Sequence, residues 1–380
     1  MDFKFNEDQE MLSKAARSFA DEFLAEYVEG IEENDEMPRE VIEEAAARDF
    51  MAVTIPEEYD GLGMGHLARI ILLEEISRVS AALGMLLQVW HLGIHPIVRF
   101  GSEEQKQKYL PRMAAGELLA GLAVTESTGG SDPTAVQTEA VKDGDDYILN
   151  GRKVYITSSH LSKVVGVMAR MADDPKSFTI FLLDEDCPGW RAGRQEKKIG
   201  FKGSNTGDLI MEDCRVPAAN IIGKIGDGLK IGLNSIGEVG RAGMAAVSLG
   251  ILAASLEDAV KFSNSRVLGG KAINKNQAIQ IKLADMYMDL EMSRLLAYKA
   301  ATLGDEGQRC DTEMAMAKYY SSEASVRSAK AACDIHGGLG YMMETPTQRY
   351  LRDALLVISS AGTTEIQQII VSKAAIKKYS

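Results

Sequence analysis

A run of small residues near the C-terminus raises the first chemical question. The stretch Ser359–Thr363 reads SSAGT and comes directly before an apolar helical pattern. Thr364 and Gln367 have the spacing of a capping box, which marks a helix start. Such a stretch offers backbone N–H groups and very little side chain, and helix N-termini suit anionic ligands. We therefore expect a ligand to approach the backbone here.

Four other pieces could contribute to the same chemistry. "AVTESTGGSDP" gives strand backbone followed by glycines and hydroxyls, and "GRKVYITSS" places an aromatic side chain beside Thr157. "SRVLGG" supplies Arg266 at the end of a helical pattern, and "IHGGLGY" adds glycines that allow close approach. Glycine-lined backbone suits pyrophosphate, and an aromatic beside hydrogen-bonding backbone suits a flat ring system.

Several familiar sites are missing from the sequence. No G-x-G-x-x-G lies between a strand and a helix, so the dinucleotide fingerprint is absent. The five histidines form no H-x-x-x-H or H-E-x-x-H pattern, which argues against a metal site. The serine hydrolase elbow G-x-S-x-G is also absent.

The elements that must position these pieces fall into three blocks. Residues 1–118 read as helices, including the nearly all-apolar stretch 82–101, which should be buried. Residues 119–228 are short segments rich in Val, Ile, Thr and Tyr between turn residues, which is typical of strands. Residues 229–380 return to helical periodicity, with four helices expected at 243–262, 276–303, 313–338 and 365–379. The absence of βαβ alternation indicates an α+β fold rather than a Rossmann fold.

Composition narrows the class of partner. The formal net charge of -13 and pI of about 5.0 argue against nucleic acid or an anionic membrane as the main partner. No apolar run is expected to reach the 18 or more residues of a membrane span, and the start "MDFKFNEDQEML" has no leader character. Four scattered cysteines favour a disulfide-free protein in the cytoplasm.

Taken together, these motifs resemble the acyl-CoA dehydrogenase family over essentially the whole chain. "PEEYDGLG", "LAVTESTGGSDP", "LNGRKVYIT", "GRAGMAAVSLG", "IHGGLGY", "RYLRDA" and "GTTEIQ" appear in family order. The resemblance implies an N-terminal helical domain, a middle β-domain and a C-terminal four-helix bundle. It also implies FAD as cofactor, an acyl-CoA substrate, an electron-transferring flavoprotein as redox partner, and a homotetramer.

The resemblance also assigns cofactor roles by position. The residues that would hold the flavin and its ribityl chain are Leu122, Val124, Thr125, Gly130 and Ser131. Those that would flank the isoalloxazine are Tyr155, Ile156 and Thr157, with the Thr157 hydroxyl reaching flavin N5. Those that would meet the adenosine diphosphate end are Thr363 and Glu365. Those that would contact the FAD of a neighbouring subunit are Arg266, Gln277, Gly337 and Gly338.

Substrate roles follow in the same way. Glu238 and Arg241 would bind CoA, with the Ser131 region also close to it. Gly362 and Gln88 would lie beside the acyl thioester. Two positions depart from the family pattern, because Asp334 replaces a frequent Gln and Leu268 replaces an aromatic. We expect FAD binding to survive both changes.

The departure that matters for catalysis is at residue 361. Most members read Tyr-Glu-Gly-Thr, and the Glu removes the α-proton of the thioester. Here that position holds Ala361, and the alternative position used by some members holds Gly240. The resemblance implies that the backbone N–H of Ala361 still polarises the thioester carbonyl.

Three explanations stay open. His91, on the same expected helix face as Gln88, could be a relocated base, because imidazole titrates near neutral pH; His95 and His336 are expected to be structural. Alternatively, a cyclic or already unsaturated acyl-CoA could lose a γ-proton in a 1,4-elimination to a conjugated diene, or a different leaving group could be eliminated. The third explanation is a non-catalytic flavin- or CoA-binding protein.

Overall fold

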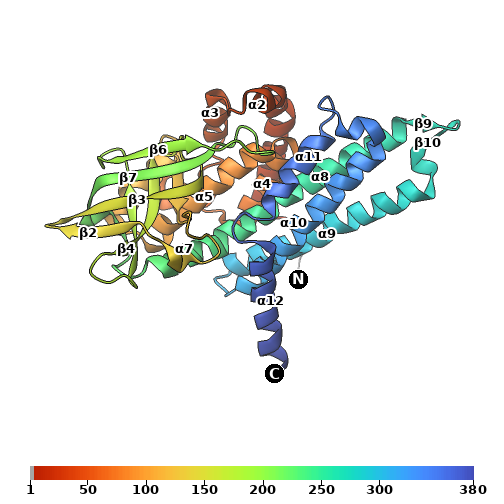
Figure 1. The fold of residues 1–380 in the computed structure, drawn as a ribbon. Helices are drawn as coiled ribbons and strands as arrows, with labels where there is room; N and C mark the ends of the chain where they lie inside the picture. Colours follow the sequence, from red (N-terminus) through yellow and green to blue (C-terminus); the bar gives the residue numbers. More distant parts are fainter. Residues whose placement is uncertain (1–3) are drawn as a thin grey trace.

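The computed structural model describes residues 4–380, so the first three residues of the predicted N-terminal domain lie outside the description. Helices, then strands, then helices follow one another along the chain (Figure 1). The predicted α+β architecture is confirmed. The predicted boundary at 118 falls in the link between α6, which ends at Ala114, and β1, which begins at Ala120. The predicted boundary at 228 falls on the first residue of α7, Gly228, just past the link that follows β8 at Ile222.

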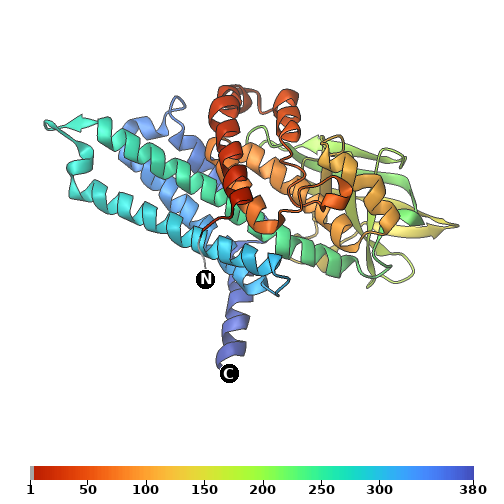
Figure 2. The ribbon, with the colours of Figure 1, turned by 180° about the vertical axis from the view of Figure 1, so that it is seen from behind.

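The N-terminal helices lie across the junction between the sheet and the bundle (Figure 2). They are α1 (Glu7–Ser18), α2 (Val28–Asn34), α3 (Arg39–Ala47), α4 (Gly65–Val79), α5 (Ala81–Phe100) and α6 (Glu103–Ala114). Asn6 caps α1 in a capping box with Gln9. Helix α5 is buried along almost its whole length, which confirms the prediction for the apolar stretch.

The middle block is one mixed sheet with the strand order β6-β7-β3-β2-β4-β5-β8, and β1 pairs in parallel with β4. Its strands are β1 (Ala120–Ala123), β2 (Glu139–Asp143), β3 (Asp146–Thr157), β4 (Val164–Met171), β5 (Phe178–Leu183), β6 (Trp190–Gln195), β7 (Thr206–Pro217) and β8 (Ile221–Ile222). Strand β4 is buried on both faces, because helices cover one side and other strands the other.

The C-terminal block begins with a continuous helix that changes character along its length. It comprises α7 (Gly228–Ser235), a π-helical turn η6 (Ile236–Gly240) and α8 (Arg241–Ser265). A small hairpin, β9 (Val267–Leu268) and β10 (Lys271–Ala272), leads to α9 (Gln277–Asp305) and α10 (Asp311–His336). Helices α11 (Thr347–Val357) and α12 (Thr364–Tyr379) complete the chain.

The fourth bundle helix is not the one that the sequence suggested. Helix α11 packs against α8 and α10, whereas α12, the predicted fourth member, projects away from the body of the molecule (Figure 1). The helix start is also shifted by one residue. Thr363, not Thr364, is the N-cap, with its hydroxyl accepting a bond from the N–H of Ile366.

Two helices are apolar enough to cross a membrane by length and composition, which corrects the expectation that no stretch approaches that length. They are α5 and the continuous helix Gly228–Ser265. In the fold, 83% and 89% of their most apolar windows are buried inside the protein. The four cysteines are free and buried.

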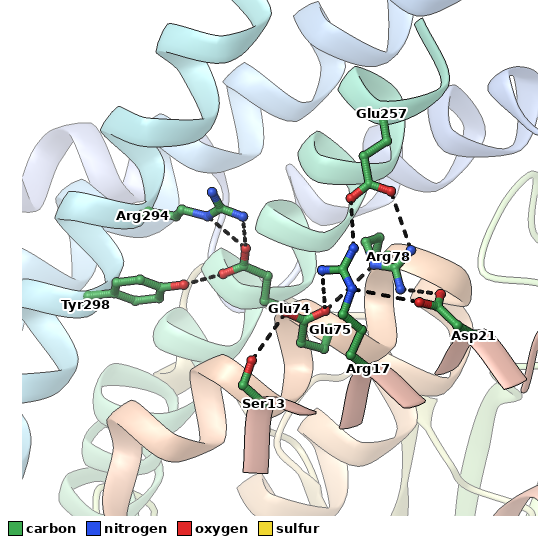
Figure 3. Close-up of polar contacts among 9 residues, drawn as sticks. All are labelled: Ser13, Arg17, Asp21, Glu74, Glu75, Arg78, Glu257, Arg294 and Tyr298. Carbon is green, nitrogen blue, oxygen red and sulfur yellow. Dashed lines mark hydrogen bonds and ion pairs between the residues drawn. The ribbon is translucent and has the colours of Figure 1, made fainter. Parts of the chain in front are cut away.

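An ion-pair network joins the N-terminal helices to the bundle (Figure 3). Glu74 of α4 accepts bonds from Arg294 at 2.7 and 2.8 Å and from the Tyr298 hydroxyl at 2.6 Å, both on α9. Arg78, also on α4, pairs with Asp21 and with Glu257 of α8. Charged groups, as well as apolar contacts, thereby fix α4 to the segment that contains Asp21 and to the bundle helices α8 and α9.

Candidate active site

A cavity of about 830 Å³ lies where the sheet, α5, η6 and the 359–363 turn meet. Eleven of the predicted cofactor and substrate residues line it. They are Leu122, Val124, Thr125, Gly130, Ser131, Tyr155, Ile156, Thr157, Ala361, Gly362 and Thr363. The structure therefore brings together segments more than 200 residues apart in the sequence.

The wall formed by the sheet carries an exposed aromatic in a strained backbone. Tyr155 has φ +56°, a region that bulky residues rarely occupy, and 67% of it is exposed. The β3–β7 register shifts between Lys153 and Ile156, so a bulge aims this segment. Strain of this kind concentrates at ligand sites, and the exposed ring beside Thr157 fits a flat aromatic cofactor.

Two ion pairs hold that wall in place. Glu126 accepts a bond from the buried Lys153 ammonium at 2.7 Å and also bonds the backbone of Gln137 and Thr138. Asp208, 1% exposed, pairs with Arg152. Sequence reasoning missed these four charged residues as parts of the site. Arg152 and Lys153 in "GRKVY" and Asp208 in "TGDLI" look like ordinary strand polarity, and Glu126 lies among the hydroxyls and glycines of "TESTGG", so no local signal pointed to them.

The opposite wall is apolar where it comes from helices. Met85, Val89 and Leu92 of α5 and Ile236 of η6 form it, together with the 359–363 turn. The acidic side chains among the described residues that line the cavity are Glu126, Glu196 and Asp208, all from the sheet block. The helical wall therefore contains no carboxylate or imidazole among those lining residues.

The turn itself is held in an unusual backbone shape. Ala361 has φ +53° and Gly362 φ +94°. The Gln367 side-chain amide donates to the carbonyls of both residues, at 3.3 and 3.0 Å. Since the carbonyl and the next N–H of a trans peptide point in opposite directions, this anchor leaves the N–H of Gly362 facing away from Gln367. Gln367, expected only as a capping partner, is a structural part of the site.

The two positions where the resemblance led us to expect a base, 240 and 361, face one another. A Cβ built on Gly240 would lie 3.3 Å from the Cβ of Ala361. Both positions are therefore directed at one point, and neither carries a proton acceptor.

The structure does not support His91 as the relocated base. His91 is 1% exposed, its Nε2 bonds the Phe50 carbonyl at 3.1 Å, and its Nδ1 bonds the Thr54 hydroxyl at 3.1 Å. Burial lowers the pKa of His91 to about 3. It does not line the cavity, so the expectation is corrected to a core histidine with both nitrogens satisfied.

Gln88 is likewise a core residue rather than a substrate contact. Its Oε1 accepts a bond from Arg69 at 2.6 Å, and its Nε2 donates to the Val239 carbonyl at 3.1 Å. Gly243 must be a glycine here, because a Cβ would lie 1.5 Å from Gln88 Oε1. Gln88 and Arg69 together hold the π-helical turn next to Gly240.

Glu238 and Arg241 lie on η6 and at the start of α8 without lining the main cavity. Glu238 borders a separate hollow of about 330 Å³, and bonds to His95 and Asn234 lower its pKa to about 2. His95 therefore has a structural role, as expected. Arg241 is largely buried, and its Nε has no hydrogen-bond partner among the described residues.

The residues expected to serve a neighbour's cofactor lie at the far end of the bundle, near the hairpin (Figure 1). Arg266 is the C-cap residue that follows α8, Gln277 begins α9, and Gly337 and Gly338 follow α10. Asp334 bonds Lys282 at 3.0 Å, which ties α10 to α9 there, and Leu268 is 66% exposed on β9. Glu365, at the start of α12, does not line the cavity. His336 stacks on Phe262 and is structural.

The comparisons with known proteins cover the whole chain. Family models described as the acyl-CoA dehydrogenase N-terminal, middle and C-terminal domains match residues 6–117, 121–214 and 226–376. An acyl-CoA dehydrogenase of Bacillus subtilis is 41% identical over 97% of both chains. A 3-(aryl)acrylate reductase of Clostridium sporogenes is 37% identical over 98% of this chain and 100% of that one.

Solved structures agree with these matches. The butyryl-CoA dehydrogenase of Megasphaera elsdenii superimposes with a TM-score of 0.96 at 35% identity, over 99% of this chain and 100% of that one. A glutaryl-CoA dehydrogenase of Mycobacterium smegmatis in complex with FADH2 does so with 0.93 at 28%, over 99% and 96%. A further sequence relative, a caffeyl-CoA reductase-Etf complex subunit of Acetobacterium woodii, is 35% identical over 98% of this chain and 100% of that one.

Proposed function

The chain belongs to the acyl-CoA dehydrogenase family of FAD-dependent oxidoreductases, and we propose that it acts on a cyclic or already unsaturated acyl-CoA without an α-side carboxylate base. FAD, when bound, supplies the hydride acceptor or donor. The cavity fits it, because the strained Tyr155, Thr157 and the glycine-containing segment around Gly130 offer ring and backbone contacts. The remaining roles belong to the chain's own residues.

The 359–363 turn would orient and polarise the thioester. The N–H of Ala361 would donate to the thioester carbonyl, and backbone donation survives replacement of Glu by Ala. Donors of this kind contribute about 3 kcal/mol in comparable oxyanion sites. The apolar wall of Met85, Val89 and Leu92 would pack on the acyl group and exclude water.

The observation that carries the proposal is the facing pair Gly240 and Ala361. Their Cβ positions converge to 3.3 Å, so the volume that a carboxylate would fill from either side belongs to the substrate. A ring, or a substituted carbon next to the thioester, would use that volume. In an unsaturated thioester the γ-protons are acidic through conjugation to the polarised carbonyl. In a 1,4-elimination a γ-proton would be lost to water, and FAD, when bound, would supply the acceptor for the hydride from a second carbon.

A second candidate function is reduction of an enoyl or arylacryloyl thioester, and the 3-(aryl)acrylate reductase relative favours it. Hydride would go to the β-carbon, and water would protonate the α-carbon of the resulting enolate. An enolate is basic enough to take a proton from water, whereas removing that proton from a saturated thioester requires a positioned base. The missing base therefore hinders reduction less than oxidation.

We also propose a homotetramer, an electron-transferring flavoprotein as redox partner, and the cytoplasm as location. The apolar residues exposed on α9 and α12 and the remote position of Arg266 and Gln277 support assembly. The Etf-complex relative supports the partner, and the free, buried cysteines suit a reducing compartment.

One anaerobic experiment tests the proposed function. The FAD-loaded protein is mixed with straight-chain, branched, arylacryloyl and alicyclic CoA thioesters, both saturated and unsaturated, with the flavin oxidised and then with it reduced. For the first function, we expect a cyclic or unsaturated thioester to bleach the oxidised flavin. For the second function, we expect an enoyl thioester to reoxidise the reduced flavin. A protein that bleaches only with saturated straight-chain thioesters contradicts both. Indifference to all of them supports a binding protein.

A further inference from the structure

A buried lysine lies directly beneath the 359–363 turn. Lys318 belongs to α10 and is fully buried. Its ammonium donates a hydrogen bond to the carbonyl of Ile358, the residue just before the turn. Its place in an ordinary helical pattern did not distinguish it from other lysines.

The charged groups around Lys318 come from three helices. Glu323 lies on the same helix, Glu365 on α12 and Arg241 on α8. The Glu323 carboxylate accepts a bond from the Thr364 hydroxyl at 2.7 Å. The ammonium thus has a neutral backbone carbonyl as its hydrogen-bond partner, and the carboxylates of Glu323 and Glu365 lie further away. The positive charge of Arg241 repels the ammonium.

Such an arrangement is costly for stability. A buried cation without a close counter-ion loses its hydration, and apolar replacements of buried charges are often neutral or stabilising. Burial accordingly lowers the pKa of Lys318 to about 8. Because the buried Lys318 ammonium does not stabilise the fold, we look for its role in the site.

The position of the bond suggests that role. The turn contains two consecutive residues with positive φ, Ala361 and Gly362, and is anchored at its far end by Gln367. Lys318 anchors the near end through Ile358. The two anchors fix the peptide planes between them, and a charge-assisted bond is about twice as strong as a neutral one.

We propose that Lys318 is a positioning residue that fixes the 359–363 turn so that the backbone N–H of Ala361 faces the thioester carbonyl. This inference rests on the proposed function, since it needs a thioester whose carbonyl lies at Ala361. It predicts a defect specific to ligands that carry that carbonyl.

The test compares thioesters with thioethers that lack the carbonyl. Crotonyl-CoA and benzoyl-CoA are paired with S-(but-2-enyl)-CoA and S-benzyl-CoA, and affinities for the FAD-loaded protein are measured by calorimetry. The parent should prefer the thioester of at least one pair. Lys318→Met should reduce that preference by about threefold to tenfold, the scale of one hydrogen bond. The affinity for the thioether should not change, and the unfolding temperature should stay the same or rise. Arg327→Met, which removes a cation on α10 that pairs with Asp289, should change neither affinity.

The pH dependence adds a readout that packing alone would not give. Between pH 7 and pH 9 the parent's preference should fall, because Lys318 loses its proton near pH 8. Lys318→Gln keeps a neutral donor, so its preference should be intermediate and equal at both pH values; it also serves if the Met variant fails to fold. Equal weakening of thioester and thioether in the variants overturns the inference. A parent with no thioester preference overturns the proposed function itself.

Discussion

At the scale of single residues, the proposed function depends on Ala361 and Gly240, the two positions where the resemblance led us to expect a base. Ala361→Glu and Gly240→Glu should each place a carboxylate at the same point, since the two Cβ positions are 3.3 Å apart. We expect either variant to gain α,β-dehydrogenation of a saturated acyl-CoA by about 10²-fold or more, the scale of a general base. Single-turnover flavin bleaching measures it. The double variant should dehydrogenate the saturated acyl-CoA more slowly than either single variant, because two carboxylates would share one site. If neither single variant gains activity, the thioester does not lie at this point.

Lys318 also makes a prediction about stability and pH. Its pKa is about 8 in the folded protein against 10.5 when exposed. Between these values the unfolded chain binds more protons, so the free energy of unfolding should rise with pH. Lys153, with its pKa also lowered to about 8 by burial, contributes in the same direction. Lys318→Met should therefore reduce this rise without abolishing it, as measured by unfolding midpoints at pH 7.5, 9 and 10. A parent and variant with parallel curves would contradict the assignment.

His91 shows what residue-level reasoning lacks. Its spacing relative to Gln88 was compatible with a single helix face, and that part of the inference holds because both side chains are buried on α5. Which neighbours meet that face depends on Phe50, Thr54 and Val239 from other elements. A sequence gives the face of a helix, and only the fold gives the partner.

At the scale of elements, α4 is the connection between the N-terminal block and the bundle. Glu74→Ala would leave the Arg294 guanidinium and the Tyr298 hydroxyl without their buried acceptor (Figure 3). We expect a loss of about 3 kcal/mol, the usual scale for breaking a buried pair, measured by urea unfolding. Glu291→Ala removes the exposed i,i+3 partner of the same arginine and should cost about 0.5 kcal/mol or less. Equal losses would show that burial of Glu74 adds nothing.

The order of helices and strands could be predicted from the sequence, but which helices pack against one another could be predicted only in part. Periodicity identified α8, α9 and α10, because each buries a continuous face in the bundle. It also marked α12, whose pattern is equally apolar, yet only its first turn is buried. Helix α11 was seen as a motif and not as a bundle member. Apolar periodicity shows that a face will be covered, without showing whether the same chain covers it.

At the scale of the whole molecule, α12 makes the assembly testable. Ile369, Ile376 and Tyr379 are 47%, 66% and 81% exposed on a helix that projects from the body. Exposed apolar residues of this kind mark interfaces. Ile369→Glu with Ile376→Glu should convert the proposed tetramer into smaller species, seen by light scattering, with lower FAD content. Met11→Glu, which changes an exposed methionine on α1, should do neither. An unchanged mass would place the interface elsewhere.

The π-helical turn Ile236–Gly240 changes the direction in which the buried face of the helix points, from the sheet on one side of the turn to the bundle on the other. Successive residues of an α-helix turn by about 100°, so one additional residue rotates everything before it relative to everything after it. Helix α7 packs its apolar side on β4 and β5, whereas α8 packs on α4 and α10. One uninterrupted rod thus serves two layers that lie in different directions. Deletion of one residue of this turn other than Ile236 would rotate α7 relative to α8 and misalign the sheet with the bundle, even though no side chain that lines the cavity had changed.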